Sequence, residues 1–217
     1  MGYFRELPDL QYQSFLSDSL SSQSYLTVKN LFRRNKLRDD LSGVFTLFNK
    51  YEIPEGSRPE LVAEEFYGKA DLDWVVLMTA GIINVRDEWP LSNYHLYKYA
   101  EEKYGLSELN GVHHYETKEV KDSNGRLILP KEKVVDSTFT IPDPADYSAT
   151  LNPVRPVTNW EYETRENDKK SSIYLLRREY LQQFLNDMRQ IMIYDRSSQY
   201  VTEDLARTEN TRVTIPS

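Results

Sequence analysis

The sequence of 217 residues contains no cysteine, three histidines and eight glycines. Without cysteine, the chain can form no disulfide, no thiolate metal site and no cysteine nucleophile. The glycines are mostly single, so the sequence holds no glycine-rich phosphate loop. No stretch approaches the ~18 apolar residues that a membrane-spanning helix needs. These absences argue against cysteine chemistry, a phosphate-binding loop and a membrane partner.

An excess of positive charge is also missing. The formal net charge is −7, and residues 51–110 alone carry 12 acidic and 5 basic side chains. The rest of the chain is balanced between the two signs. Because nucleic-acid binding needs a net basic face, we expect no nucleic-acid partner.

The sequence offers no catalytic pattern. His113 and His114 are adjacent in an expected strand, so they should point to opposite faces, where they cannot easily share a metal. His95 has no second ligand at a metal-binding spacing. The pairs Glu64-Glu65 and Glu101-Glu102 are typical of solvated helix faces. No serine lies in a Gly-x-Ser-x-Gly turn. We therefore predict no enzyme activity, no cofactor and no metal site.

The segment from Tyr51 to Pro90 has the clearest local pattern. It predicts a strand that ends at Ile53, a helix that ends at Gly68, and a second helix that ends at Gly81, since glycine adopts the left-handed conformation of a helix C-cap without strain.

Helix starts are also marked in this segment. Ser57 and Glu60 have the spacing of a capping box, and Pro59 falls in the first turn, where a missing N–H costs little. Asp71 is the expected N-cap of the second helix. Trp74–Met78 is apolar nearly all round, which predicts a buried helix.

The N-terminal part has a different composition. Residues 3–15 are expected to be an extended arm, and 17–24 a polar spacer. Residues 25–37 predict a short helix, and Val44–Phe48 a strand. A basic cluster follows the apolar positions of that helix: Lys29, Arg33, Arg34, Lys36 and Arg38. The cluster is interpreted either as a solvated face or as a contact with an acidic surface of a partner or of the same chain.

Beyond residue 91 the pattern alternates between helix and short strands. Residues 92–104 predict a helix that ends at Gly105, and residues 112–141 a small β-region with an Asn124-Gly125 hairpin turn. Five of the ten prolines lie between Pro130 and Pro156, so 142–160 is expected to be an extended arm.

The C-terminal part is expected to contain a strand at 160–164, a turn at 167–170, a strand at 173–176 and an amphipathic helix from Glu179. Its apolar stripe is Leu181, Phe184, Leu185, Met188, Ile191 and Met192. Such a stripe usually packs in a core, and the alternative is a partner groove. The polar tail, 194–217, is expected to be mobile unless bound.

The central segment resembles a LysM module, in the variant found in phage tail proteins. The matching residues are Tyr51, Ile53, Glu55-Gly56, Ala63, Tyr67-Gly68, Trp74 and Asn84. A LysM module closes with a second strand soon after its second helix, whereas another helix follows here. The closing strand is therefore expected to be absent or displaced.

The resulting fold class is α+β, with a LysM-like βαα module, an extra helix, a small β-hairpin region, extended arms and a C-terminal amphipathic helix. The expected segments are an N-terminal arm with a basic helix (1–43), the LysM-like module with an acidic helix (44–111), the hairpin region (112–141), a proline-rich arm (142–172) and a strand, helix and tail (173–217).

The whole chain resembles the baseplate wedge protein 53 family of T-even-type, contractile-tailed bacteriophages. The resemblance is carried, in order, by Tyr3–Pro8, Val28–Arg34, Phe48, Tyr51, Arg58-Pro59-Glu60, Val62-Ala63, Tyr67-Gly68, Trp74 and His113–Glu116. Beyond Gly125 the likeness becomes weak.

The resemblance implies a structural protein of the virion tail baseplate, assembled in the cytoplasm of the bacterial host. Family members help to join neighbouring wedges into a six-fold ring around the central hub. The implied partners are the wedge core proteins, the sheath-like wedge protein, neighbouring wedges and the hub. We expect partner contacts at Tyr3, Phe4, Lys29, Phe32, Arg33, Arg34, Trp89, Phe184 and Met188, with Trp89 exposed beside its acidic neighbours.

Two other functions stay open at this point. The first is a peptidoglycan-binding LysM module of a tail-associated protein. The second is a small cell-wall hydrolase that uses paired carboxylates, which nothing in the sequence favours.

Overall fold

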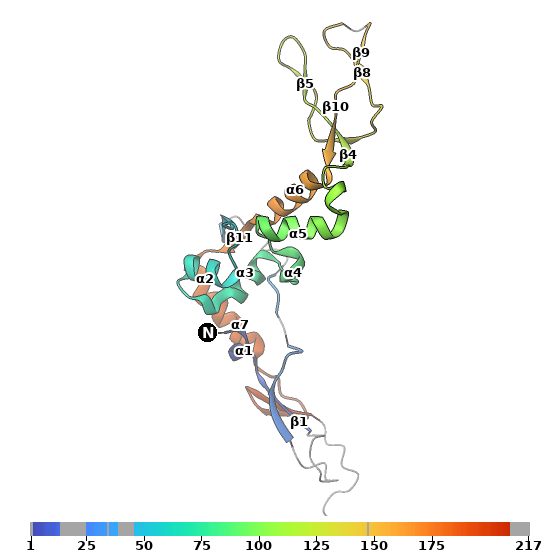
Figure 1. Cartoon of the computed structure of the whole chain (residues 1–217). Helices are drawn as coiled ribbons and strands as arrows, with labels where there is room; N and C mark the ends of the chain where they lie inside the picture. Colours follow the sequence, from blue (N-terminus) through green and yellow to red (C-terminus); the bar gives the residue numbers. More distant parts are fainter. Residues whose placement is uncertain (1, 14–24, 34, 39–45, 147, 209–217) are drawn as a thin grey trace, which may run out of the picture. The chain divides into compact units, whose positions relative to one another are not determined.

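The structure is a computed structural model that describes residues 2–13, 25–33, 35–38, 46–146 and 148–208 (Figure 1). The chain divides into two compact units. Unit 1 is drawn from Met1–Glu52, Ser57–Glu88 and Ile173–Ser217, and unit 2 from Ile53–Gly56 and Trp89–Ser172. In the sequence, most of unit 2 is thus an insertion between two parts of unit 1.

Unit 1 contains the central helices. These are α2 (Pro59–Tyr67), the 3-10 helix η2 (Ala70–Leu72), α3 (Asp73–Ala80) and α4 (Val85–Glu88). Gly68 and Gly81 end α2 and α3 in the left-handed conformation, with φ of 77° and 74°, which confirms the two expected C-caps.

The expected N-caps of these helices are wrong. Arg58 is the N-cap residue of α2 and no side chain caps that helix, so the Ser57 capping box does not form. Asp71 lies within η2, and Leu72 precedes α3. The 3-10 turn takes up the residues at which an N-cap was expected.

The core of unit 1 lies between α2, α3 and two C-terminal elements, β11 (Ser172–Leu176) and α7 (Arg178–Met192). Its fully buried apolar side chains include Val62, Ala63, Val75, Val76, Leu175 and Met188. The Tyr67 hydroxyl donates to the Leu176 carbonyl oxygen at 2.8 Å, and burial raises the pKa of this tyrosine. This hydrogen bond ties α2 to β11.

The first strand of the central segment is β3 (Phe48–Glu52), and it pairs with β11. The strand expected at 44–48 is wrong at Thr46 and Leu47, which form a turn, and only its last residue, Phe48, belongs to β3. The strand position follows its pairing, since the Arg177 N–H, just after β11, donates to the Leu47 carbonyl oxygen at 3.0 Å.

A four-stranded sheet in unit 1 joins segments from both ends of the sequence. After the short helix α1 (Tyr3–Glu6) come β1 (Asp9–Gln13) and β2 (Tyr25–Lys29), and the late strands are β12 (Tyr200–Thr202) and β13 (Leu205–Arg207). Their order is β12-β13-β1-β2, with β1 parallel to β13 and antiparallel to β2.

This sheet corrects three expectations. Residues 3–13 form a helix and a strand instead of an extended arm, and residues 25–29 form a strand instead of a helix. Tyr25, Thr27 and Val28 favour a strand, and β1 supplies the hydrogen-bond partners. Residues 200–202 and 205–207 are strands, so that part of the tail is held by the sheet. The spacer at 17–24 lies outside the described residues.

Unit 2 pairs two helices with a three-stranded sheet. The helices are α5 (Asn93–Tyr104) and α6 (Asn159–Ser171), with the 3-10 helix η3 (Leu106–Glu108) after α5. The sheet has the order β10 (Val154–Thr158), β4 (Val112–Thr117), β7 (Val134–Val135). The expected helix at 92–104 is confirmed, and the Ser92 side chain caps it by accepting from the His95 N–H.

The strand expected at 160–164 and the turn at 167–170 are wrong, because both lie in α6. The Thr158 hydroxyl caps this helix by accepting from the Glu161 N–H at 3.1 Å. An ion pair at i,i+4 spacing, Glu161–Arg165, further supports it. The aromatic alternation at 160–164 is outweighed by these local contacts.

Two hairpins extend unit 2 beyond the far ends of β4 and β10 (Figure 1). The expected hairpin is confirmed: β5 (Val120–Lys121) pairs with β6 (Leu127–Leu129), and Gly125 has φ of 79° in the turn. The other pairs β8 (Ile141–Pro142) with β9 (Thr150–Leu151). The proline-rich segment is thus extended, but its β10 end is a sheet strand.

Candidate interaction surface

The two faces of the four-stranded sheet differ in chemistry. Residues that are directly opposite in neighbouring strands lie on the same face. In β1 and β2 these pairs are Leu10 with Val28 and Tyr12 with Leu26. One face of this pair of strands is therefore apolar.

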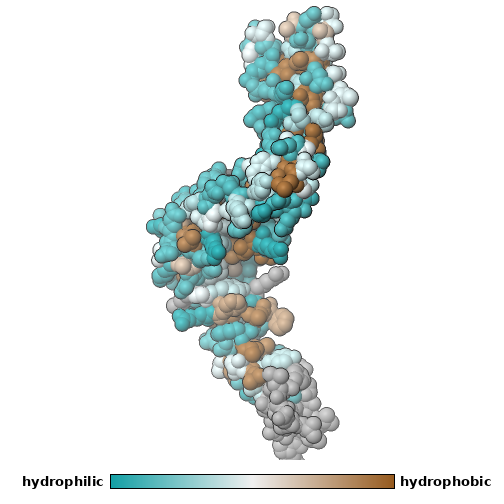
Figure 2. Space-filling model, viewed as in Figure 1, coloured by the Kyte–Doolittle hydropathy of each residue, from teal (hydrophilic) through white to brown (hydrophobic). Residues whose placement is uncertain are grey.

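The apolar face is incompletely covered. Tyr12 and Leu26 are each 48% exposed and Val28 is 44% exposed, whereas Ala206, which pairs with Leu10, is buried. Figure 2 shows hydrophobic side chains at the surface in the region where Figure 1 labels β1. We call Tyr12, Leu26 and Val28 the terminal-sheet patch.

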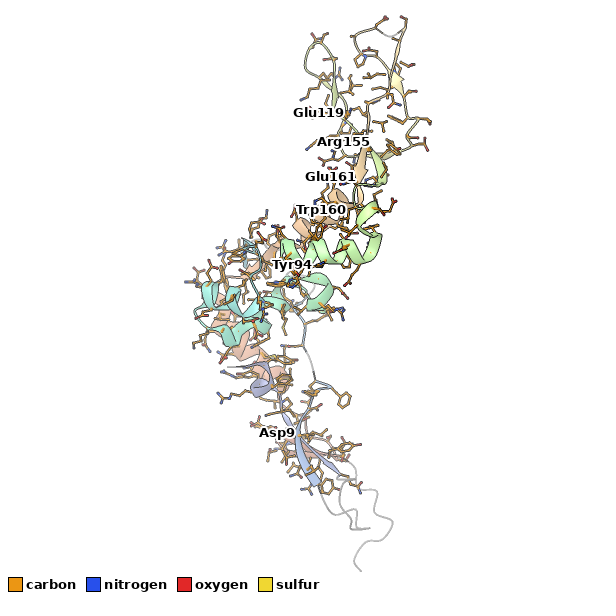
Figure 3. All side chains as sticks on the ribbon, in the orientation of Figure 1. Asp9, Tyr94, Glu119, Arg155, Trp160 and Glu161 are labelled. Atoms are coloured by element: carbon orange, nitrogen blue, oxygen red, sulfur yellow. The ribbon has the colours of Figure 1, made fainter. Side chains whose placement is uncertain are left out.

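The opposite face is polar and paired within the chain. Lys29 Nζ lies 2.8 Å from an Asp9 carboxylate oxygen, and Figure 3 labels Asp9 on β1. Arg207 donates to the Gln11 side chain at 2.7 Å, and its guanidinium lies 5.0 Å from the centre of the Tyr25 ring. Because these charged groups already have partners within the chain, the exposed apolar side chains of the other face are the better candidates for a contact with another protein.

The residues just after β2 extend this surface. Leu31 is 64% exposed and Phe32 is 93% exposed. Arg33 donates to the carbonyl oxygens of Ile191 and Ile193 at 2.9 and 3.0 Å, so it caps the C-terminal end of α7. Of the two interpretations of the basic cluster, Lys29 and Arg33 fit contacts within the same chain.

The other residues expected to bind partners have mixed positions. Phe4 is 64% exposed, while Tyr3 and Phe184 are half-buried and both contact the Trp74 ring, at ring-centre distances of 5.7 and 5.8 Å. Arg34 lies outside the described residues.

Trp89 and Met188 are not at the surface. Trp89 is 7% exposed, so the expected exposure is wrong, and Met188 is 1% exposed in the core of unit 1. The large apolar area of a tryptophan favours burial more strongly than its acidic neighbours favour exposure. Neither side chain is available to a partner in this conformation.

Sequence reasoning missed the terminal-sheet patch. The alternation of apolar residues at positions 10 and 12, and again at 26 and 28, was a usable signal for two half-buried strands. The two apolar pairs belong to neighbouring strands, but a polar spacer separates them in the sequence, so their pairing is not evident.

Unit 2 holds a buried ion-pair network around Glu116, which is 5% exposed. Its carboxylate accepts from Arg165 at 2.9 Å and from Arg155 at 3.2 Å, and Arg155 also pairs with Glu161 at 3.1 Å (Figure 3). Burial alone would raise the pKa of Glu116, but hydrogen bonds from Arg165 and His114 outweigh it and lower that pKa. The network ties β4 and β10 to α6.

The adjacent histidines lie together, and their expected placement on opposite faces is wrong. The Nδ1 atoms of His113 and His114 are 2.8 Å apart, and His113 stacks on Tyr162 at 3.9 Å. The register pairs Thr158 with Val112 but Val157 with His114, so His113 is the extra residue of a β-bulge, which turns both rings to one side.

Among the described residues, no group of three or more histidine, aspartate or glutamate side chains is arranged to hold a metal ion. In the same part of the chain, no helix is both long enough and apolar enough to cross a membrane. The surface most suited to a function is the terminal-sheet patch.

Comparison with known proteins gives one finding. No curated protein sequence matches the chain. A family model described as base plate wedge protein 53 matches residues 18–191, which is well over half of the chain. The family consists of structural baseplate proteins and not of enzymes. The chain therefore belongs to the base plate wedge protein 53 family and is a structural component of a phage baseplate.

Proposed function

We propose that the chain joins neighbouring wedges of the baseplate into a six-fold ring around the hub, through protein–protein contacts. The terminal-sheet patch is the observation that carries this proposal. A sheet face with Tyr12, Leu26 and Val28 each more than 40% exposed retains apolar area that association can bury. The partners are wedge core proteins, the sheath-like wedge protein and the neighbouring wedge.

The position of β2 supports the same proposal. Among the described strands, in the order β12-β13-β1-β2, β2 lies at the edge of the sheet, and edge strands can accept further strands from other chains. Phe32, just beyond this edge, supplies an exposed aromatic side chain of the type that anchors interfaces.

Sedimentation of the purified chain, alone and then mixed with wedge proteins of the same phage, tests the proposal. The expected result is a chain that sediments as a larger complex only after mixing. If the chain sediments unchanged in the presence of every wedge protein, the proposal is contradicted. Binding to insoluble peptidoglycan would then be measured.

We also propose that β3, α2, α3 and β11 form a LysM-like module. Support comes from the pairing of β3 with β11, which supplies a second strand after the two helices. On this proposal unit 2 is an insertion before the closing strand, which accounts for the missing strand after residue 90. The peptidoglycan measurement then separates a packing module from one that binds glycan.

Charge contributes a further hypothesis. The acidic segment 51–110 and the basic cluster 29–38 are proposed to help set the register between subunits. Reversing Arg33 and Arg34 to glutamate should weaken assembly without unfolding unit 1. Because Arg33 also caps α7, the thermal unfolding of the variant must be compared with that of the unchanged chain. Unaltered assembly would reject this idea.

A further inference from the structure

A pocket of about 310 Å³ in unit 1 lies at the start of α7. It is lined by Asn49 of β3, Phe66 of α2, and Arg177, Arg178 and Glu179 at the start of α7. None of these side chains belongs to the terminal-sheet patch. Two of the five are arginines, so the pocket has the chemistry of an anion site.

Arg177 is the less satisfied of the two arginines. Its Nε atom is buried and has no hydrogen-bond partner among the described residues. Its backbone is fixed, because the Arg177 N–H donates to the Leu47 carbonyl oxygen at 3.0 Å. A buried, unpaired donor on a cation is costly. The atom is closed to solvent in this conformation, so an acceptor in the pocket reaches it only when the Arg177 side chain turns toward the pocket.

Arg178 is held at the edge of the same pocket. It donates through Nε to the Phe66 carbonyl oxygen and through Nη2 to the Glu65 carbonyl oxygen at 3.2 Å. Its guanidinium carbon lies 5.5 Å from the centre of the Phe66 ring. A guanidinium has five N–H donors, and these two bonds fix its plane while using only two of the five.

The remaining lining residues indicate which anion fits. Glu179 offsets one of the two positive charges, so the pocket has a net charge that suits a monoanion better than a phosphate dianion. The Phe66 ring gives an apolar wall for a hydrocarbon stem. The side-chain amide of Asn49 can donate to an anion. A carboxylate on a short aliphatic stem combines these features.

We propose that the arginine pocket binds a glutamate or aspartate side chain from an acidic segment of a neighbouring baseplate protein, with Arg177 and Arg178 as donors. Guanidinium groups bind carboxylates through strong, directional, charge-assisted hydrogen bonds. The pocket would add orientation to the apolar contact that the terminal-sheet patch offers. That the carboxylate comes from a baseplate protein rests on the proposed function, whereas the inference that the pocket binds a carboxylate does not.

NMR of the arginine Nε–H groups of the full chain tests the chemistry. The probe is a capped Leu-Glu-Glu-Leu peptide, with capped Leu-Gln-Gln-Leu and inorganic phosphate as comparisons. The glutamate peptide should shift the Arg177 and Arg178 signals, and the glutamine peptide should leave them unchanged. Equal shifts from both peptides, tighter binding of phosphate, or no shift at all would overturn the proposal.

Variants make the test specific. Arg177→Gln and Arg178→Gln should each weaken binding of the glutamate peptide by about tenfold or more. Arg58→Gln is the matched control, because Arg58 is an exposed arginine of the same unit outside the pocket and should bind as the unchanged chain does. If Arg177→Gln alters thermal unfolding, the exposed Arg178 gives the decisive comparison.

The same variants separate this inference from the proposed function. If both arginine variants lose the peptide and also form less of the mixed wedge complex, the proposal is supported. If they lose the peptide but assemble normally, the assignment to a baseplate partner is wrong while the connector function stands. If the unchanged chain binds the peptide but no wedge protein, the connector function is what fails.

Discussion

Replacement of Leu26 and Val28 together by threonine should weaken association with the wedge proteins without unfolding the chain. Full burial of a leucine or valine side chain contributes about 1.5–3 kcal/mol. Leu26 is 48% exposed and Val28 is 44% exposed, so a partner that covers them gains about half of that from each. The two side chains together then contribute about 2 kcal/mol, which corresponds to about a 30-fold change in Kd.

The choice of threonine keeps the test clean. Threonine is β-branched and favours strands, so β2 should persist. The half of each side chain that is buried within the chain is also affected, and we expect unfolding to become easier by no more than about 2 kcal/mol. Urea unfolding of the variant measures this cost separately from binding.

The assay is sedimentation of the chain with each purified wedge protein over a range of concentrations. Thr27→Ser is the control, because Thr27 lies on the same strand but on the polar face, opposite Gln11. It should bind as the unchanged chain does. A folded double variant that associates with unaltered affinity would refute the argument that the terminal-sheet patch is an interface.

Three further predictions concern stability. Leu175→Ala should lower the free energy of unfolding by about 2–5 kcal/mol, because Leu175 is completely buried, and urea unfolding measures the loss. Thr158→Ala should cost about 1 kcal/mol by removing the N-cap of α6, and Thr158→Ser should restore most of it; equal losses in both variants would contradict the capping argument. Glu116 has a lowered pKa in the folded chain, so its pairing stabilises the fold above the ordinary carboxyl pKa of 4.5 and is lost as pH falls through the lowered value. The stability difference between the unchanged chain and Glu116→Gln should therefore shrink as the pH is lowered below that range, and a difference that stays constant in urea unfolding from pH 7 to pH 3 would reject this account.

Local signals predicted the parts of the fold that depend on neighbouring residues. Gly68 and Gly81 end their helices, and the Asn124-Gly125 turn forms its hairpin, because each of these needs only the conformational freedom of a few residues. The predictions for residues 25–29 and 159–171 were wrong for opposite reasons. The first segment becomes a strand through pairing with β1, and the second becomes a helix through a threonine cap and side-chain ion pairs.

The candidate surface was harder to predict than the helices. Phe4 and Phe32 are exposed as a partner contact requires, but Trp89 and Met188 are buried. The terminal-sheet patch depends on which strands become neighbours. Sequence alone does not reveal that β1 lies between β2, the next described strand along the chain, and β13, a strand near residue 205.

The parallel pairing of β1 with β13 also determines when the interface can exist. The Gln11 and Arg207 side chains that hydrogen-bond across it are separated by 196 positions. Contacts of such long range slow folding, because closing the chain between them costs conformational entropy. The ribosome must also have made residues 205–207 before β1 can gain its second neighbour. A chain whose synthesis stopped before residue 200 would lack two of the four strands. Only chains translated through residue 207 can therefore bring the assembled sheet to a growing baseplate.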